Sequence, residues 1–351
     1  MLLRGWRWLF NRSSSSKNRR PRHPLCVRPS LEPLEDRTLP AVSALNVIAG
    51  PDAGFQPLAR ILDSATGVPQ FDITAYEPSF LGGVRVAVGD VDNDGFPDVI
   101  TGPGPGRPPM VNVYSGNTML QIASFLAYGR NFTGGVFVAA GNFDTDPADE
   151  VVVGPGKGRG PLVRIFDIVG GFGIQIPGPL GSFRVYSGGF RNGVHVAAGN
   201  FDGQPGDELI VARHSGGGLV KVFQSSGALV QSFRAYQSST TGVYIDAGDV
   251  DGDGREEIIT GRGMGGPLVR VFNGGTATQI VGFRAYGPGF TGGVRVGTID
   301  ADGDQKADIV TGPGPGLGPN VRIFDGQTLA QLTSFFAFDP VFQGGIFVAG
   351  G

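Results

Sequence analysis

From residue 45 onward the chain alternates short apolar runs with short polar or glycine-rich segments. A well-formed example is 136–140, followed by an acidic segment and then by 151–153 and 162–166. The runs are rich in Val, Ile, Phe and Tyr, and Gly/Pro or Asp/Gly pairs bound them. Short runs with such boundaries predict β-strands joined by turns, and no helical period of 3.6 residues is visible.

The runs fall into four classes that recur in the same order. The first class begins at Val84, Val136, Val194, Val243, Val294 and Ile346, and the second near Asn46, Val99, Val151, Leu209, Ile258 and Ile309. The third contains 60–62, 111–114, 163–166, 220–223, 269–272 and 321–324, and the fourth ends at Tyr76, Tyr128, Tyr186, Tyr236, Tyr286 and Phe338. Four short antiparallel strands repeated about every fifty residues are typical of a propeller blade. The sequence therefore predicts an all-β fold, a β-propeller of six blades with four antiparallel strands each.

The order of the classes at the two ends predicts how the ring closes. The region 45–76 supplies second, third and fourth strands, and 344–351 supplies a first strand. Pairing these segments completes a sixth blade and protects edges that an open array would expose. A seven-bladed propeller in a longer parent chain is the alternative, because the sequence stops where a sixth acidic loop would begin.

An acidic loop follows each of the first five first-class strands. Positions 1, 3, 5 and 9 of every loop carry oxygen-bearing side chains, and position 7 varies freely. A hard cation binds six to eight oxygens, so position 7 is expected to contribute its backbone carbonyl. In the order 1, 3, 5, 7, 9, loop one has Asp90, Asp92, Asp94, Phe96 and Asp98; loop two has Asn142, Asp144, Asp146, Ala148 and Glu150; loop three has Asn200, Asp202, Gln204, Gly206 and Glu208; loop four has Asp249, Asp251, Asp253, Arg255 and Glu257; loop five has Asp300, Asp302, Asp304, Lys306 and Asp308.

These loops predict Ca²⁺ sites, four to five in number. Asp, Asn and Gly also favour ordinary turns, but a turn preference does not explain the same register in five loops. Loop three is expected to bind most weakly, because only Asp202 and Glu208 are carboxylates at its ligand positions. An EF-hand needs a Glu at position 12 and flanking helices, whereas Thr101 and Thr260 occupy that position here. Mg²⁺ fits less well because it retains more water.

The first 44 residues differ in character from the rest. Residues 1–40 contain nine Lys/Arg and three Asp/Glu, while the remainder contains 19 and 28. We expect a disordered basic N-terminal tail over 1–44, associated with export, and a propeller over 45–351. The tail lacks the unbroken apolar core of a standard signal peptide. No run of about 18 apolar residues occurs, so no transmembrane segment is expected.

The repeat resembles the FG-GAP/VCBS repeats of integrin-α-type β-propellers. The resemblance covers about 300 residues, and its core is Gly89-Asp-Val-Asp-Asn-Asp-Gly-Phe-Pro-Asp98-Val-Ile-Thr-Gly-Pro103, matched by 249–261 and 300–313. It implies that the loops joining the first two strands of a blade bind Ca²⁺ on one face, and that the protein acts in adhesion, carbohydrate binding or scaffolding. Separately, 28–40 resembles the LEPLEDR-type N-terminal segment of bacterial extracellular repeat proteins.

The sequence favours a binding module over an enzyme. The acidic body argues against a nucleic-acid partner, and the three histidines suggest no catalytic set. We expect an extracellular or cell-surface protein that binds a glycan or a protein ligand. The alternatives are a polysaccharide lyase or hydrolase on the same fold, and a purely structural surface protein. Loops such as 311–316, between second and third strands, can together form a ligand surface.

Overall fold

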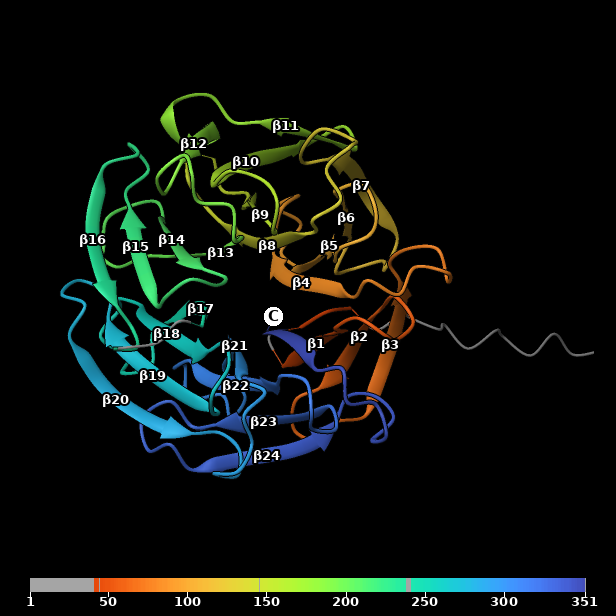
Figure 1. The fold of residues 1–351 in the computed structure, drawn as a ribbon, viewed down its shortest axis with the longest axis vertical. Helices are drawn as coiled ribbons and strands as arrows, with labels where there is room; N and C mark the ends of the chain where they lie inside the picture. The colour runs from red at the N-terminus through yellow and green to blue at the C-terminus, as the bar shows by residue number, and fades with distance from the viewer. Residues whose placement is uncertain (1–40, 44, 145, 238–240, 351) are drawn as a thin grey trace, which may run out of the picture. The chain divides into compact units, whose positions relative to one another are not determined.

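The computed structural model describes residues 41–43, 45–144, 146–237 and 241–350. Its strands form six antiparallel sheets arranged as blades in a ring (Figure 1). Blade one contains β4 (Val84–Gly89), β5 (Asp98–Pro103), β6 (Met110–Tyr114) and β7 (Gln121–Leu126); blade three contains β13 (Val194–Gly199), β14 (Glu208–Arg213), β15 (Leu219–Phe223) and β16 (Leu229–Arg234); blade four contains β17 (Val243–Gly248), β18 (Glu257–Arg262), β19 (Leu268–Asn273) and β20 (Gln279–Arg284); blade five contains β21 (Val294–Ile299), β22 (Asp308–Pro313), β23 (Asn320–Phe324) and β24 (Gln331–Phe336). The six-bladed propeller predicted from the sequence is confirmed.

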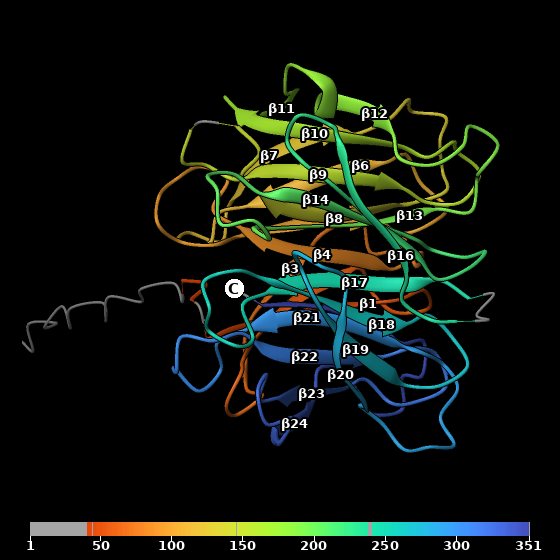
Figure 2. The ribbon, with the colours of Figure 1, turned by 90° about the vertical axis from the view of Figure 1, so that its left-hand side faces the viewer.

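The sixth blade forms by the expected pairing of the two ends of the repeat region. It contains β25 (Ile346–Gly350), β1 (Asn46–Pro51), β2 (Leu58–Asp63) and β3 (Pro69–Thr74), in that order across the sheet. Strand β25 also contacts the innermost strands β21 and β4 of its two neighbouring blades. The ring is therefore closed with six blades, and its innermost strands lie around the central axis (Figures 1 and 2).

Blade two departs from the four-strand prediction at its outer edge. It contains β8 (Val136–Gly141), β9 (Glu150–Pro155), β10 (Leu162–Val169), β11 (Phe172–Gln175) and β12 (Ser182–Arg184), with the short 3₁₀ helix η1 (Pro179–Gly181) before β12. Both β11 and β12 pair with β10. The tight turn at Gly170-Gly171, where both residues have positive φ, extends the hairpin and splits the outer strand in two.

The burial of each strand follows its place in the blade. All residues of the second strands β1, β5, β9 and β22 are buried, because a neighbouring blade covers each face. The outer strands β16, β20 and β24 instead alternate between exposed and half-buried positions. This difference explains why the second-class runs are continuously apolar whereas the fourth-class runs alternate.

A tyrosine beyond five of the six outer strands joins neighbouring blades. The sequence predicted that fourth strands end at this tyrosine, but they end two residues earlier, as at Leu126 before Tyr128. The Tyr128 ring is buried, and its hydroxyl donates to the carbonyl oxygens of Val153 at 2.8 Å and Leu162 at 2.7 Å in the next blade. Tyr76, Tyr186, Tyr236 and Tyr286 make equivalent bonds, and Phe338 occupies the sixth position.

A basic or amide side chain in each third strand completes this joint. Arg164 Nη1 donates to the carbonyl of Ala127 at 3.0 Å, and its guanidinium lies 5.3 Å from the centre of the Tyr128 ring. The corresponding donors in the other blades are Arg60, Asn112, Lys221, Arg270 and Arg322. The recurring cation of the third strand therefore packs blade against blade.

Substituting Tyr128→Phe is expected to lower the free energy of unfolding by about 1–3 kcal/mol, because two buried carbonyls lose a donor. Tyr244→Phe is the matched control, since the Tyr244 hydroxyl makes no hydrogen bond within the part of the chain that the structure describes. Urea unfolding measured for both variants checks the prediction. Equal stability of Tyr128→Phe and the control would contradict the proposed joint.

Of the predicted tail, only 41–43 are described, and the LEPLEDR-type segment lies outside the described residues. Val42 is buried, and its amide donates to the Gly116 carbonyl of blade one at 2.6 Å. Among the described residues, no helix has the length and apolar character needed to cross a membrane.

Candidate metal centres

The five acidic loops connect the innermost strand of a blade to its second strand. Position 9 is the first residue of the second strand, as Asp98 is in β5. Its carboxylate closes the loop by accepting the backbone N–H of position 2, for example from Val91 to Asp98 at 3.1 Å. The same bond links Phe143 to Glu150 at 2.5 Å and Val250 to Glu257 at 3.2 Å. A buried carboxylate thus holds each loop in one shape.

Four loops each bring three acidic side chains together. In each group, one candidate ligand atom per residue lies within 4.8 Å of the others. The groups are Asp90, Asp92 and Asp98 in loop one; Asp144, Asp146 and Glu150 in loop two; Asp249, Asp251 and Glu257 in loop four; and Asp300, Asp302 and Asp304 in loop five. Loop three forms no such group among the described residues, in agreement with its expected weakness.

The remaining predicted ligands lie around these groups without joining them. Asp94 is not part of the loop-one group. Its carboxylate accepts hydrogen bonds from Phe96 N at 2.9 Å and from Asn117 Nδ2 at 3.4 Å. Asp253 and Asp308 are likewise outside the groups of loops four and five. The carbonyl ligands at position 7 (Phe96, Ala148, Gly206, Arg255 and Lys306) remain a prediction.

The residue at position 1 divides the loops into two kinds. In loop four, Asp249 accepts hydrogen bonds from the backbone of Gly252 at 2.7 Å and Gly254 at 2.9 Å. In loops two and three an asparagine amide also donates, from Asn142 to the Asp146 carbonyl and from Asn200 to the Gln204 carbonyl, both at 2.6 Å. Loops two and three therefore lack the position-1 carboxylate of the other loops and use an amide to bond the position-5 carbonyl.

The loops differ in whether both carboxylate oxygens at position 9 have hydrogen-bond partners. When the residue is aspartate, backbone N–H groups satisfy both oxygens: those of Asp98 accept from Val91 and Gly116. In loops two and four the residue is glutamate, and one of its oxygens lacks a partner. Glu150 Oε1 and Glu257 Oε1 are buried and make no hydrogen bond. A buried carboxylate oxygen without a partner is costly, and a bound cation removes that cost.

The electrostatics of the loops agree with this observation. Burial, followed by the charge of Asp251, raises the pKa of Glu257 to about 7. Burial likewise raises the pKa of Glu150 to about 8 and that of Asp98 to about 7. Burial first, and the neighbouring carboxylates second, favour the acid forms, and a divalent cation would oppose this preference. All candidate donors are oxygens, the ligand type of Ca²⁺ and Mg²⁺.

Two further carboxylates lie next to the groups, and the sequence analysis missed both. Burial, followed by the charges of the nearby Asp144 and Asp146, raises the pKa of Asp167 in β10. Asp325 follows β23, and its charge adds a small contribution to the raised pKa of Asp308 in loop five, which is caused chiefly by burial. The signal was available, because the residue after the third strand is polar in all six blades. It was overlooked because a polar residue at a hairpin turn has a sufficient local explanation.

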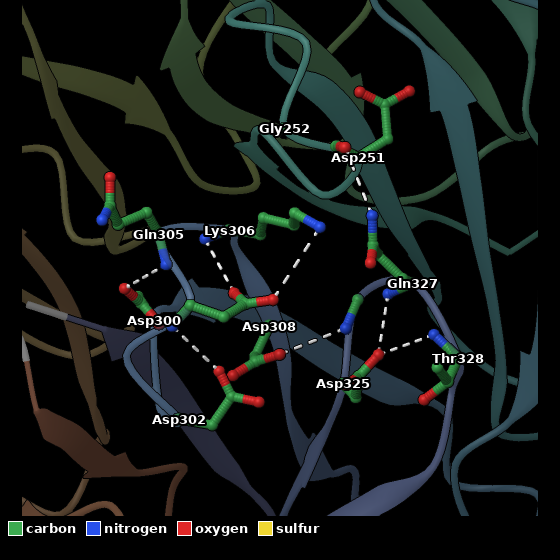
Figure 3. A network of polar contacts seen from close by, with 12 residues as sticks. Asp251, Gly252, Asp300, Asp302, Gln305, Lys306, Asp308, Asp325, Gln327 and Thr328 are labelled. Atoms are coloured by element: carbon green, nitrogen blue, oxygen red, sulfur yellow. Dashed lines mark hydrogen bonds and ion pairs between the residues drawn. The ribbon is translucent and has the colours of Figure 1, made fainter.

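Figure 3 shows the turn that begins at Asp325 and contacts two of the loops, through Gly326 to Asp308 and through Gln327 to Asp251. The Asp325 carboxylate accepts the backbone N–H of Gln327 at 3.0 Å and of Thr328 at 2.6 Å, which orders the turn after β23. The Gln327 side-chain amide then donates to the Asp251 carbonyl of loop four at 3.3 Å. Blade five therefore supports the loop of blade four.

Lys306 Nζ in loop five lies 3.9 Å from Asp304 Oδ2. Among the described residues, Lys306 is the only cation paired with a loop carboxylate.

Position 8 places a second set of acids on the central axis. Asp149 Oδ2 accepts the backbone N–H of Asp90 in the preceding blade at 3.0 Å, and Asp207 Oδ2 accepts that of Asn142 at 2.9 Å. With Glu256 and Asp246 they line a cavity of about 280 Å³ between the innermost strands. Burial raises the pKa of Glu256 to about 8, that of Asp246 to about 7 and that of Asp149 to about 6.

Glu257→Gln is expected to have opposite effects with and without calcium. Without calcium the variant should be slightly more stable, because a buried oxygen near two aspartates loses its charge. With millimolar calcium it should be less stable than the parent by about 1 kcal/mol, because one ligand is lost. Thermal melts measure both. Glu208→Gln is the matched control in loop three, and a change of sign in that variant as well would contradict the assignment.

Comparison with known families identifies the repeat. Residues 82–116 match the FG-GAP repeat family. This segment includes β4, loop one, β5 and β6 of blade one, and the other blades repeat the same arrangement of strands. The chain is a six-bladed β-propeller that contains an FG-GAP repeat in its first blade. The predicted resemblance to the integrin-α-type propeller is thereby confirmed, and the LEPLEDR-type resemblance remains untested.

One solved structure shares the fold of this propeller, and a second resembles it less closely. A protein of unknown function from Bacteroides caccae has a TM-score of 0.52 at 9% identity, covering 87% of this chain and 98% of its own. The WD40 β-propeller domain of Doa1 has a TM-score of 0.47 at 14% identity, covering 86% and 83% respectively. A search of curated proteins finds no match.

Proposed function

We propose that this FG-GAP propeller is an extracellular calcium-binding module that binds a glycan or protein ligand and has no catalytic activity. The observation that carries the calcium assignment is the pair of buried, unpartnered oxygens on Glu150 and Glu257, each within an acidic group. FG-GAP repeats are typical of extracellular proteins, where calcium is present at concentrations that weak oxygen sites can use.

The residues present fit a calcium ion in four loops. Loops one, two, four and five each offer three acidic side chains at one point, and each group is held by backbone hydrogen bonds to its own loop. The ion would neutralise the repulsion within a group and fix the loop between the two inner strands of its blade. Calcium would therefore act as a structural support for the face of the propeller that carries the loops.

The binding function is tested by presenting the calcium-saturated protein to a panel of immobilised polysaccharides. The proposal predicts retention on a subset of them without shortening of the chains or release of reducing ends. Release of unsaturated or reducing-end products would instead support a lyase or hydrolase. Absence of retention on every polysaccharide and on a matching panel of surface proteins would support the purely structural alternative.

A further inference from the structure

The second residue of each innermost strand contributes to a cluster on the central axis. The six residues are Arg85, Phe137, His195, Tyr244, Arg295 and Phe347. Phe137 in blade two and Phe347 in blade six are not in neighbouring blades, yet their ring centres are 6.5 Å apart. The Phe347 ring also lies 5.0 Å from the guanidinium groups of both arginines. These contacts show that side chains from several blades meet and pack at the axis.

A cavity of about 390 Å³ lies at the end of the propeller opposite the metal loops. Its walls include Gly242, which precedes β17, and Gly263, which follows β18. Loop four joins the other ends of these same two strands. The side chains that give the cavity its character are Asp52, Lys157, His214, Tyr244, Met264 and Arg295. We refer to it as the axial pocket, and its volume is in the range of small-molecule sites.

The axial pocket carries a net positive charge. Lys157 and Arg295 contribute two positive charges, and Asp52 is the one carboxylate among the described lining residues. Asp52 is paired with Arg295 at 2.6 Å. Arg295 is 4% exposed, and its Nε is buried without a hydrogen-bond partner. A second buried arginine, Arg85, lies nearby and also has an Nε without a partner.

Two histidines lie in the same positively charged environment. His195 Nε2 and His214 Nδ1 are 2.9 Å apart and share a hydrogen bond, so one ring donates and the other accepts. The sequence analysis did not foresee this pair. Burial lowers the pKa of His214 to about 4, and the next contributions are the charges of Arg85 and Lys157. His214 is therefore neutral at physiological pH and leaves the lysine and arginine as the positive groups.

We infer that the axial pocket binds the carboxylate of an acidic sugar, with Lys157 and Arg295 as its charge partners. The pocket has the volume of a small ligand, a buried guanidinium at its base and an aromatic ring, Tyr244, on its wall. Arginine favours carboxylates because its planar group offers donors in a matching geometry. Aromatic rings supply the apolar contact surface that small ligands use. The inference names the ligand site of the proposed binding function and does not depend on the metal loops.

Calorimetric titration of the full chain in saturating calcium tests the inference, with D-glucuronate, glucose and inorganic sulfate as probes. Glucuronate is expected to bind, glucose to show no binding, and sulfate to bind at least tenfold more weakly than glucuronate. Lys157→Gln should weaken glucuronate binding about fivefold, because one positive charge of the pocket is lost. Asp52→Asn should tighten it about fivefold, because Arg295 is released from its carboxylate.

Arg234→Gln is the control for loss of a positive charge, since Arg234 is exposed at the end of the outer strand β16. It should leave glucuronate affinity unchanged. Equal affinity for glucose and glucuronate, or unchanged glucuronate affinity in both pocket variants, would overturn the inference. Sulfate binding as tight as glucuronate would overturn the assignment to an acidic sugar. If Asp52→Asn does not fold, Lys157→Gln decides alone, because its side chain is exposed. Failure here, with a calcium-dependent melt retained, leaves the calcium module intact.

Discussion

Removing calcium with excess EDTA is expected to lower the melting temperature of this propeller by about 9 °C. At a calcium concentration ten times the dissociation constant, each site that binds only the folded protein adds about 1.4 kcal/mol. Four such sites, as the acidic groups suggest, add about 6 kcal/mol. For a domain of about 300 residues, the entropy of unfolding converts this energy into about 9 °C.

Differential scanning calorimetry in calcium and in EDTA measures this shift. Magnesium at the same concentration should produce a smaller shift, because it retains more of its water. Asp90→Asn combined with Asp92→Asn should remove about one quarter of the calcium effect, since one group of four is lost. Equal melting temperatures in calcium and EDTA would show that the loops are polar turns without a metal.

Without calcium, the protein is expected to become less stable as the pH rises from about 4 to about 8. The pKa of Glu256 is raised to about 8 and that of Asp246 to about 7, both chiefly by burial. An acid with a raised pKa binds more protons in the folded state than in the unfolded state. Its stability contribution is therefore complete below the unfolded pKa and is lost as the pH rises through the folded pKa. For Glu256 alone the loss is about 4 kcal/mol, or about 6 °C.

Calcium is expected to reduce this pH dependence. The loop carboxylates, such as Glu150 and Asp98, must be ionised to bind the cation, so calcium stabilises most at high pH. Melting curves between about pH 5 and about pH 8, with calcium and with EDTA, measure both slopes. Glu256→Gln should make the stability in EDTA depend less on pH, because the side chain no longer ionises. Blade five already has an uncharged residue, Ala307, at the same position. A stability in EDTA that increases as the pH rises would contradict the account.

The fold was predictable from the sequence because each blade repeats the same local pattern. Six first strands begin where the sequence places them, from Val84 to Ile346, because each follows a pair of residues that includes glycine and opens a strongly apolar run. The outer strands were predicted two residues too long, because Tyr128 and its equivalents are apolar enough to continue a strand. Their hydroxyl bonds to the next blade are long-range contacts that a local pattern does not contain.

The candidate metal centres were predictable in part. Alternating acids in five loops indicated the ligand positions, and the expected weakness of loop three followed from Gln204 and from its having only two carboxylates at those positions. The difference between aspartate and glutamate at position 9 was not predictable, because it depends on whether backbone N–H groups reach both oxygens, as Gly116 does for Asp98. The axial pocket was foreseen only as a ligand surface on the loops between second and third strands, which supply Lys157, Met264 and Pro315, and its charged groups were not foreseen. Its residues, such as Asp52 and Lys157, are about 100 positions apart and meet only when the ring closes.

The central claim is that the acidic loops are calcium sites, and counting bound calcium tests it most directly. Equilibrium dialysis of the full chain against calcium, with bound metal measured by atomic absorption, gives the number of ions per molecule. We predict four ions, falling to three in Glu257→Gln and remaining four in Glu208→Gln. No bound calcium, or a number unaffected by the loop-four variant, would contradict the account.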